Sequence, residues 1–161
     1  MKKIRGSKMK LIKDFIPDTA KCATHHGFDN GTASVLTIHW IGPFPEQTPE
    51  QVRDYWINSK GEASAHFIIK DDVCLQCWPL DTVAWHAGCR AGNYTSIGIE
   101  VIPYNTLGMF SDKSIATLKE LIRTQFKGWP IVRHYDWTGK DCPAYYLDSN
   151  KWSALLRNIT G

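Results

Sequence analysis

The chain has 161 residues, of which 43% are hydrophobic and 22% are charged. This length and composition suit a globular protein of one domain with a sizeable core. The formal net charge is only +3, and the basic residues are scattered without aromatic partners, so we expect no nucleic-acid partner. No apolar stretch approaches the roughly 20 residues of a membrane-spanning helix, so membrane insertion is not expected.

The N-terminal half is predicted to alternate strands with one helix. That helix begins after Thr48, because Thr48 is a good N-cap, Pro49 suits the first helical position and Gln51 completes a capping box. Val52, Tyr55 and Trp56 then fall on one helical face. The strands are expected at 34–41, 66–70 and 73–78, with Asp71-Asp72 as a tight turn between the last two.

The C-terminal half continues this alternation. A strand at 95–102 precedes a helix that starts after Ser111 and ends at Gly128 and Pro130, and a short strand at 129–133 follows. The apolar faces of this helix and of a C-terminal helix are Ile115, Leu118, Ile122 and Phe126, and Trp152, Leu155, Leu156 and Ile159. Strands mixed with helices around one sheet predict an α/β fold. Without repeats or linkers, residues 1–161 are expected to form a single domain.

The segment His134–Pro143 places an imidazole, a primary amine and a thiol on what we expect to be one short loop after a strand. His134 and Cys142 are residue types that bind zinc, and such a loop can bring both onto one ion. A third ligand should come from elsewhere, and His39, at the end of the strand 34–41, is the candidate. Three protein ligands would leave the fourth zinc position for water. Taken alone, each of the three also fits a buried structural role.

Glu100 is an independent candidate for chemistry. It lies in an apolar strand on the side opposite Ile97 and Ile99, next to Gly98, whose missing side chain suits the floor of a cleft. A desolvated carboxyl has a raised pKa and can exchange protons near neutral pH, although an exposed strand face is the alternative. Lys140, two residues before Cys142, would lie close enough to stabilise an oxyanion.

The other cysteines carry less information. The total of five is odd and does not indicate a disulfide framework. Cys74 and Cys77 have the spacing of redox or metal pairs, but they lie in a predicted strand and lack a second pair. We expect Cys74 and Cys77 to be buried structural thiols, and the sequence leaves the roles of Cys22 and Cys89 open.

Five short motifs occupy about residues 33–158. They are Thr37-Ile38-His39, Ser64-Ala65-His66-Phe67, Ala84-Trp85-His86-Ala87-Gly88, Ser96-Ile97-Gly98-Ile99-Glu100 and the segment His134–Pro143. In this order they resemble the zinc-dependent N-acetylmuramoyl-L-alanine amidases of the amidase-2 family, which includes phage endolysins and bacterial autolysins and is related to peptidoglycan recognition proteins. The resemblance implies a single mixed β-sheet flanked by α-helices. It also implies cleavage of the amide between N-acetylmuramic acid and L-alanine in bacterial peptidoglycan.

The resemblance also implies roles for individual residues. His39, His134 and Cys142 would bind Zn²⁺, Glu100 would be the acid/base carboxylate and Lys140 the catalytic lysine. Alternatively, Cys142 could be the thiol nucleophile of a cysteine hydrolase, with His134 as its base. A receptor that binds peptidoglycan without cleaving it, or a structural zinc site with a fourth protein ligand, are further alternatives.

Four residues are expected to line the substrate groove: His66, His86, Trp40 and Trp85. Each has a structural alternative, since Trp85 also suits the core and His86 also suits a hydrogen-bond partner of a ligand. Some relatives place a tyrosine before the histidine that matches His66. Ala65 stands there in this chain, so the role of that tyrosine would fall to Glu100 or be missing.

The biological setting is predicted from what the sequence lacks. Residues 1–13 have no apolar segment and no small-residue cleavage site, so a secretory signal peptide is not expected. No wall-binding repeat is seen. We therefore expect a monomeric phage endolysin that is made in the bacterial host cytoplasm and released to the cell wall. A cytoplasmic recycling amidase and a secreted autolysin are the alternatives.

Overall fold

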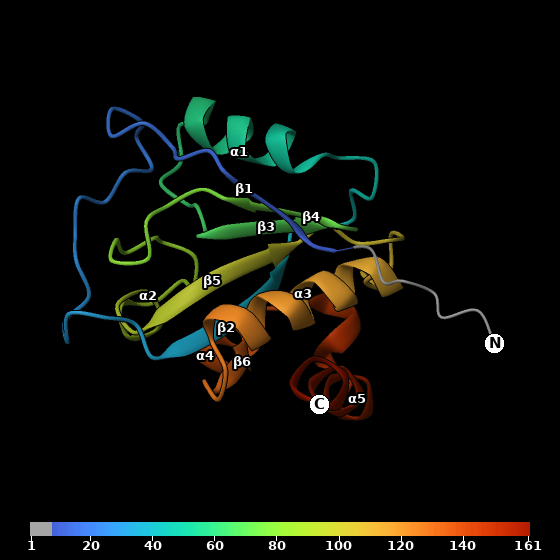
Figure 1. Ribbon diagram of the computed structural model, residues 1–161. Coiled ribbons are helices and arrows are strands. Elements are labelled where there is room, and N and C mark those ends of the chain that lie inside the picture. The colour runs from blue at the N-terminus through green and yellow to red at the C-terminus, as the bar shows by residue number, and fades with distance from the viewer. Residues whose placement is uncertain (1–7) are drawn as a thin grey trace.

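The structure, a computed structural model, describes residues 8–161 and is built on one six-stranded sheet (Figure 1). The strand order is β1-β4-β3-β5-β2-β6, and neighbouring strands are parallel except for the antiparallel pair β3 and β4. The strands are β1 (Lys10–Lys13), β2 (Val35–Trp40), β3 (Phe67–Lys70), β4 (Val73–Gln76), β5 (Ser96–Val101) and β6 (Ile131–Arg133). Four of them match the predicted strands 34–41, 66–70, 73–78 and 95–102 to within two residues at either end.

Helices cover both faces of this sheet. Helix α1 lies on one face, and α3 and α5 pack together on the other (Figure 1). The helices are α1 (Pro49–Asn58), α2 (Arg90–Asn93), α3 (Asp112–Gln125), α4 (His134–Thr138), the 3-10 helix η1 (Ala144–Leu147) and α5 (Ser149–Thr160). The predicted single mixed sheet flanked by helices is confirmed. Among residues 8–161, no helix combines the length and the apolar character needed to cross a membrane.

The two faces of the central strands have different chemistry. Leu36 and Ile38 of β2 and Ile97 and Ile99 of β5 point into the main core, under α3 and α5. On the α1 side, Val52 and Trp56 cover Ile68 of β3. Next to Ile68 on this same side, β5 and β2 carry polar residues: Glu100 pairs in register with Ile68 and with His39, and Gly98 pairs with Thr37. Apolar helix packing therefore stops where the polar residues begin.

Helix ends follow the predicted capping signals. The side chain of Thr48 accepts from the Gln51 backbone at 3.2 Å, and the Gln51 side chain accepts from the Thr48 backbone at 2.9 Å. Ser111 caps α3, as predicted. Tyr55 differs from the prediction: it is 70% exposed, whereas Val52 and Trp56 are buried. It projects from α1 beside the apolar face instead of within it.

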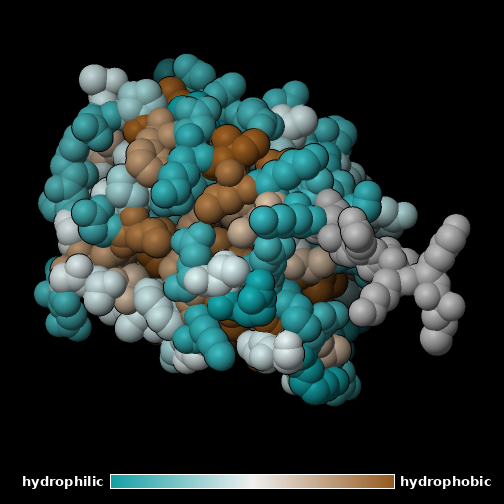
Figure 2. Space-filling model, viewed as in Figure 1, coloured by the Kyte–Doolittle hydropathy of each residue, from teal (hydrophilic) through white to brown (hydrophobic). Residues whose placement is uncertain are grey.

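Strand β1 was not predicted, because four residues with lysine at both ends carry no clear alternation. It lies at the edge of the sheet, and all four residues are exposed. Lysines on an edge strand oppose pairing with another chain. On the face shown in Figure 2, hydrophobic residues reach the surface as separate groups among hydrophilic ones.

The capping box predicts a stability effect. Replacing Thr48 by alanine removes the acceptor for the first-turn N–H of α1 and should lower the free energy of unfolding by about 1 kcal/mol. Urea denaturation monitored by circular dichroism measures this change. The exposed neighbour Glu46→Ala is the control and should stay within about 0.5 kcal/mol of the parent protein. Equal stability of the Thr48→Ala and Glu46→Ala variants would contradict the assignment.

Candidate active site

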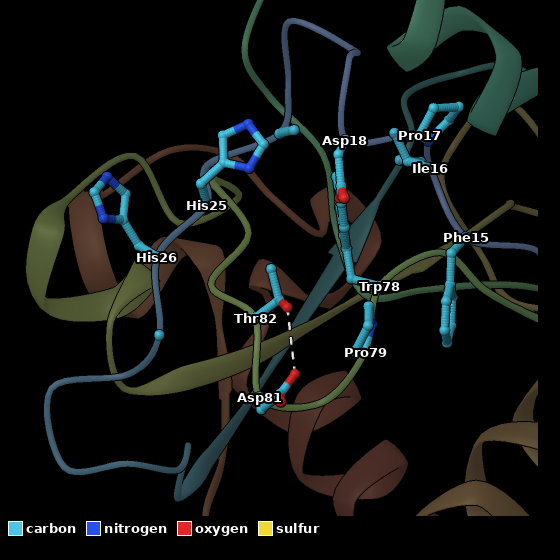
Figure 3. A pocket seen from close by; sticks show the side chains of 12 residues that line it. Phe15, Ile16, Pro17, Asp18, His25, His26, Trp78, Pro79, Asp81 and Thr82 are labelled. Carbon is cyan, nitrogen blue, oxygen red and sulfur yellow. Dashed lines mark hydrogen bonds between the residues drawn. The ribbon is translucent and has the colours of Figure 1, made fainter.

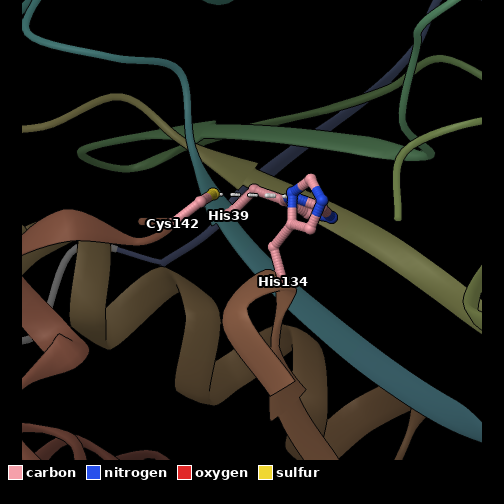
Figure 4. A group of neighbouring side chains, drawn as sticks. All are labelled: His39, His134 and Cys142. Carbon is pink, nitrogen blue, oxygen red and sulfur yellow. Dashed lines mark hydrogen bonds between the residues drawn. The ribbon is translucent and has the colours of Figure 1, made fainter. Parts of the chain in front are cut away.

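Three predicted metal ligands converge at the polar part of the sheet (Figure 4). The Nδ1 atoms of His39 and His134 are 3.1 Å apart, and the Sγ atom of Cys142 lies 3.7 Å from Nδ1 of His39. All three side chains are buried, and their donor atoms lie within 4.8 Å of one another. The structure thus brings together residues separated by about a hundred positions in the chain.

The segment that carries two of these ligands is not a loop throughout, which corrects the prediction. His134 is the first residue of the short helix α4, which follows directly on β6. Asp136 stabilises this turn, because its carboxylate accepts from the backbone N–H of Arg133 at 2.8 Å and pairs with the guanidinium at 2.7 Å. Gly139 ends the helix with φ +76°, a conformation that glycine adopts at little cost. The chain then returns towards the sheet with Cys142.

The Nδ1 atoms of the two histidines face each other, and each ring has a further hydrogen-bond partner. Nε2 of His39 is 2.9 Å from Nδ1 of His86, and the ring of His134 bonds to the backbone of Ala87. Burial lowers the pKa of His39 well below 6.5 and that of His134 to about 4, so both rings are neutral at pH 7. Two imidazole lone pairs and one sulfur therefore point at a common position. This donor set fits a borderline-soft divalent metal.

Cys142 is poorly suited to be a nucleophile. Burial, with the charge of Glu100, raises the pKa of its thiol to about 12. An enzyme nucleophile needs the reverse, a lowered pKa or a base in contact. The imidazole in contact with its sulfur is that of His39, not that of His134 as the cysteine-hydrolase alternative requires. The geometry favours Cys142 as a ligand, whose thiolate a cation stabilises.

Glu100 has the environment expected for a proton carrier. Its Oε1 atom is 3.9 Å from Nδ1 of His39, and its buried Oε2 atom has no hydrogen-bond partner among the described residues. Burial raises the pKa of Glu100 to about 8, although the positive charge of Lys140 opposes this shift. A carboxyl in this state can exchange a proton with water or substrate near neutral pH.

Lys140 carries a positive charge at the solvent-exposed opening of the site. Its side chain lines the same small cavity as Glu100, His134 and Cys142, and its charge lowers the pKa of His134. The residue is exposed, so its ammonium group is available to a bound molecule. An oxyanion formed in this cavity would lie within its field.

The small cavity is continuous with a wider groove. The cavity at the three ligands has a volume of about 110 Å³, and the groove has about 410 Å³. Both are lined by Trp40, Trp56, Glu100 and Lys140, and the groove adds Phe44, Ile41, Gln47, Val52 and Tyr55. Of this aromatic wall, only Trp40 was predicted to line the groove. Tyr55 within the capped helix was the available signal, but its helical spacing predicts a core face equally well.

The four residues expected to contact substrate take different places. Trp40 and Trp85 line the cavity and are both partly buried against the main core. His86 also lines it but is 7% exposed, with its ring bonded to His39. His66 has no exposed surface: Nδ1 accepts from the backbone N–H of Gly98 at 3.0 Å, and Nε2 bonds to the carbonyl of Thr82 at 2.7 Å. In this structure His66 is a buried support and does not line the groove.

A larger cavity lies elsewhere on the described part of the chain. It has a volume of about 770 Å³ and is lined by the segments 15–18, 23–27 and 78–82 (Figure 3). Its lining shares no residue with the cavity at His39, and the group of metal-binding type found among residues 8–161 is not part of it. Cavity size alone therefore does not locate the chemistry.

The α/β sheet thus carries a buried His-His-Cys group that could hold a metal ion, beside a desolvated carboxyl. Residues 29–145 match the amidase-2 family, described as N-acetylmuramoyl-L-alanine amidase, and the chain belongs to this family. Its predicted family resemblance is thereby confirmed.

Similar proteins agree with this assignment. The N-acetylmuramoyl-L-alanine amidases CwlH and XlyA of Bacillus subtilis (strain 168) are 37% and 36% identical to the chain, over 93% and 95% of its length. The alignments cover 61% of CwlH and 52% of XlyA, so the chain spans little more than half of these curated relatives. A solved mutant endolysin from Bacillus subtilis superposes with a TM-score of 0.79 at 29% identity, covering 94% of this chain and 99% of that one.

The burial of His66 predicts a pH-dependent stability. Desolvation lowers its pKa from 6.5 to about 4, so the folded protein favours the neutral ring. Its contribution to the free energy of unfolding is complete above pH 6.5 and is lost as the pH falls to 4, because the unfolded chain takes up the proton at a higher pH than the folded protein does. The pKa shift corresponds to about 3 kcal/mol.

Urea denaturation of the metal-free protein at pH 7.5 and 4.5 measures this loss. The His66→Asn variant keeps an acceptor near Gly98 and has no titrating ring, so its stability should fall less between these two pH values than that of the parent. The exposed His25→Asn is the matched control and should behave like the parent. Parallel losses in all three proteins would show that His66 does not contribute.

Proposed function

We propose that this domain is a zinc-dependent N-acetylmuramoyl-L-alanine amidase. It hydrolyses the amide between the lactyl group of N-acetylmuramic acid and the L-alanine of the stem peptide in bacterial peptidoglycan. The observation that carries the proposal is the convergence of three possible donor atoms, on His39, His134 and Cys142, directly beside the buried carboxyl of Glu100. The names of the relatives supply the substrate.

The His-His-Cys group holds the metal. Two imidazole nitrogens and one thiolate are the ligand types that zinc prefers, and three protein ligands are typical of catalytic zinc sites. When bound there, zinc would supply a water of lowered pKa and would polarise the scissile carbonyl. His39 comes from β2 and His134 from α4, whereas Cys142 follows the loop with Lys140. Separate elements therefore fix the three donors.

Glu100 moves the proton. Its carboxylate takes a proton from the attacking water and passes it to the amine that leaves as the amino terminus of the stem peptide. The desolvated position on β5 keeps its pKa near the working pH, which suits a group that must both accept and release a proton. Lys140 stabilises the negative charge that develops on the carbonyl oxygen.

The groove beside this site binds the polymer. Trp40, Phe44, Tyr55 and Trp56 give it an aromatic wall suited to the apolar faces of sugar rings and peptide side chains. The endolysin among the structural neighbours supports a lytic role at the bacterial wall. We infer that the protein acts there after release from a phage-infected host.

Chelation tests the proposal directly. Purified Gram-positive walls treated with the protein should lose turbidity and gain L-alanine amino termini, and both effects should stop with EDTA and return with added zinc. Metal analysis should give about one zinc per chain. Wall binding without new amino termini would indicate a receptor. Hydrolysis by protein shown to be free of metal would indicate that Cys142 acts as a nucleophile.

Glu100 can be tested without disturbing the ligands. Glu100→Gln keeps the shape of the side chain but removes its proton exchange, so turnover should fall by a factor on the order of 10²–10⁴ while zinc content is unchanged. The exposed Glu62→Gln is the control and should cleave walls at the parent rate. A Glu100→Gln variant with full turnover would exclude Glu100 as the acid/base group.

A further inference from the structure

The ring of His86 is bonded at both nitrogens. Nδ1 lies 2.9 Å from Nε2 of His39, and Nε2 lies 3.2 Å from the backbone carbonyl oxygen of Ser96. The ring is almost completely buried behind His39, and the two rings meet edge to face with centroids 5.1 Å apart. The amidase chemistry described above assigns His86 no role.

These two contacts determine where the ring protons lie. A carbonyl oxygen only accepts, so Nε2 of His86 must be the N–H group that donates to Ser96. In the neutral ring Nδ1 then carries a lone pair, and it accepts from Nε2–H of His39. The neutral ring of His39 has one N–H group, so its Nδ1 is left unprotonated. This is the nitrogen that faces His134 and Cys142.

The surroundings of His86 hold this arrangement in place. The side-chain oxygen of Asn93 accepts from the backbone N–H groups of His86 and Ala87, at 2.9 and 2.7 Å. Gly98 on β5 makes room for the ring: a Cβ atom there would lie 2.5 Å from Cγ of His86. Any other residue at position 98 would push the ring away from His39.

The backbone carbonyl of Ser96, which accepts the hydrogen bond from His86, is also held in a fixed position. Ser96 is the first residue of β5 and is fully buried. Its hydroxyl donates to the carbonyl of Gly92 at 2.7 Å and accepts from the hydroxyl of Thr37 at 2.8 Å. Thr37 in turn accepts from the indole N–H of Trp137 at 2.9 Å. A buried polar network therefore extends from β2 and α4 to the carbonyl that orients His86.

We propose that His86 is a positioning residue that fixes His39 in the Nε2–H tautomer and thereby presents Nδ1 of His39 to the metal. This inference rests on the metal site of the proposed function and deepens it. Without His86, the ring of His39 is free to take the other tautomer or to rotate, and either change removes the donor atom. Partners of this kind typically change metal affinity by about 10–100-fold.

The tautomer is measured first in the parent protein. Long-range ¹H–¹⁵N correlation spectra of the metal-free protein at pH 7.5 distinguish protonated from bare ring nitrogens. His39 and His86 should both give the pattern of a single Nε2–H tautomer. An Nδ1–H tautomer of His39 would overturn the proposal, and this result depends neither on a variant nor on whether the protein hydrolyses peptidoglycan.

Two variants then separate the hydrogen bond from the packing. His86→Phe keeps a ring over Gly98 but has no acceptor, so His39 should show mixed tautomers and zinc affinity should fall on the order of 10–100-fold. His86→Asn places a carbonyl oxygen near the former Nδ1 and should recover most of the affinity and the single tautomer. Competition with a chromophoric chelator measures zinc affinity without an activity assay.

The outcomes are distinguishable from failure of the proposed function. If the parent protein binds no zinc, the proposed function fails, whereas the spectra still report the His39 tautomer. If the parent binds zinc, and His86→Phe keeps its affinity while His86→Asn loses it, His86 acts through packing and the positioning role is excluded. Unchanged affinity and an unchanged tautomer in a folded His86→Phe variant would exclude it as well.

Discussion

The parallel pairing of β2 with β5 is the constraint on which the site depends. Its register sets His39 beside Glu100 and Thr37 beside Gly98 on one face of the sheet, while the alternate residues fill the core. A shift of one residue in this register would turn His39 into the core and an isoleucine towards the groove. The hydrophobic face thus fixes the position of the reactive face.

Burial shifts the pKa values of these polar groups and also costs folding free energy. Desolvation lowers the pKa of His39 and raises that of Glu100, so that neutral imidazole and a carboxyl ready to exchange protons lie 3.9 Å apart. A buried polar atom without a partner, such as Oε2 of Glu100, costs roughly 1–3 kcal/mol. The surrounding network around His86 and Ser96 is saturated with hydrogen bonds, so the cost is confined to the reactive group.

Sequence reasoning succeeded where one residue type in one local pattern has few physical explanations. A carboxylate in an apolar strand and a histidine at a strand end pointed to Glu100 and His39, which the structure places 3.9 Å apart, and Thr48 with Gln51 identified the start of α1. It failed where the same pattern has two meanings. His66 and His86 both lie in short motifs that contain alanine, yet His66 is hydrogen-bonded to backbone groups on both sides and His86 is hydrogen-bonded to His39. The spacing of Tyr55 suits a core or a groove.

By itself, the sequence determined the elements, the strand faces and the types of donor atom, because these depend on propensities, on alternation along a strand and on side-chain chemistry. Tertiary structure alone decided which donors meet. His134 and Cys142 lie 95 and 103 positions from His39, and their convergence follows from the placement of β6 beside β2. It also decided the protonation pattern, since the proton positions on His39 depend on His86, which reaches it only through the close approach to Gly98.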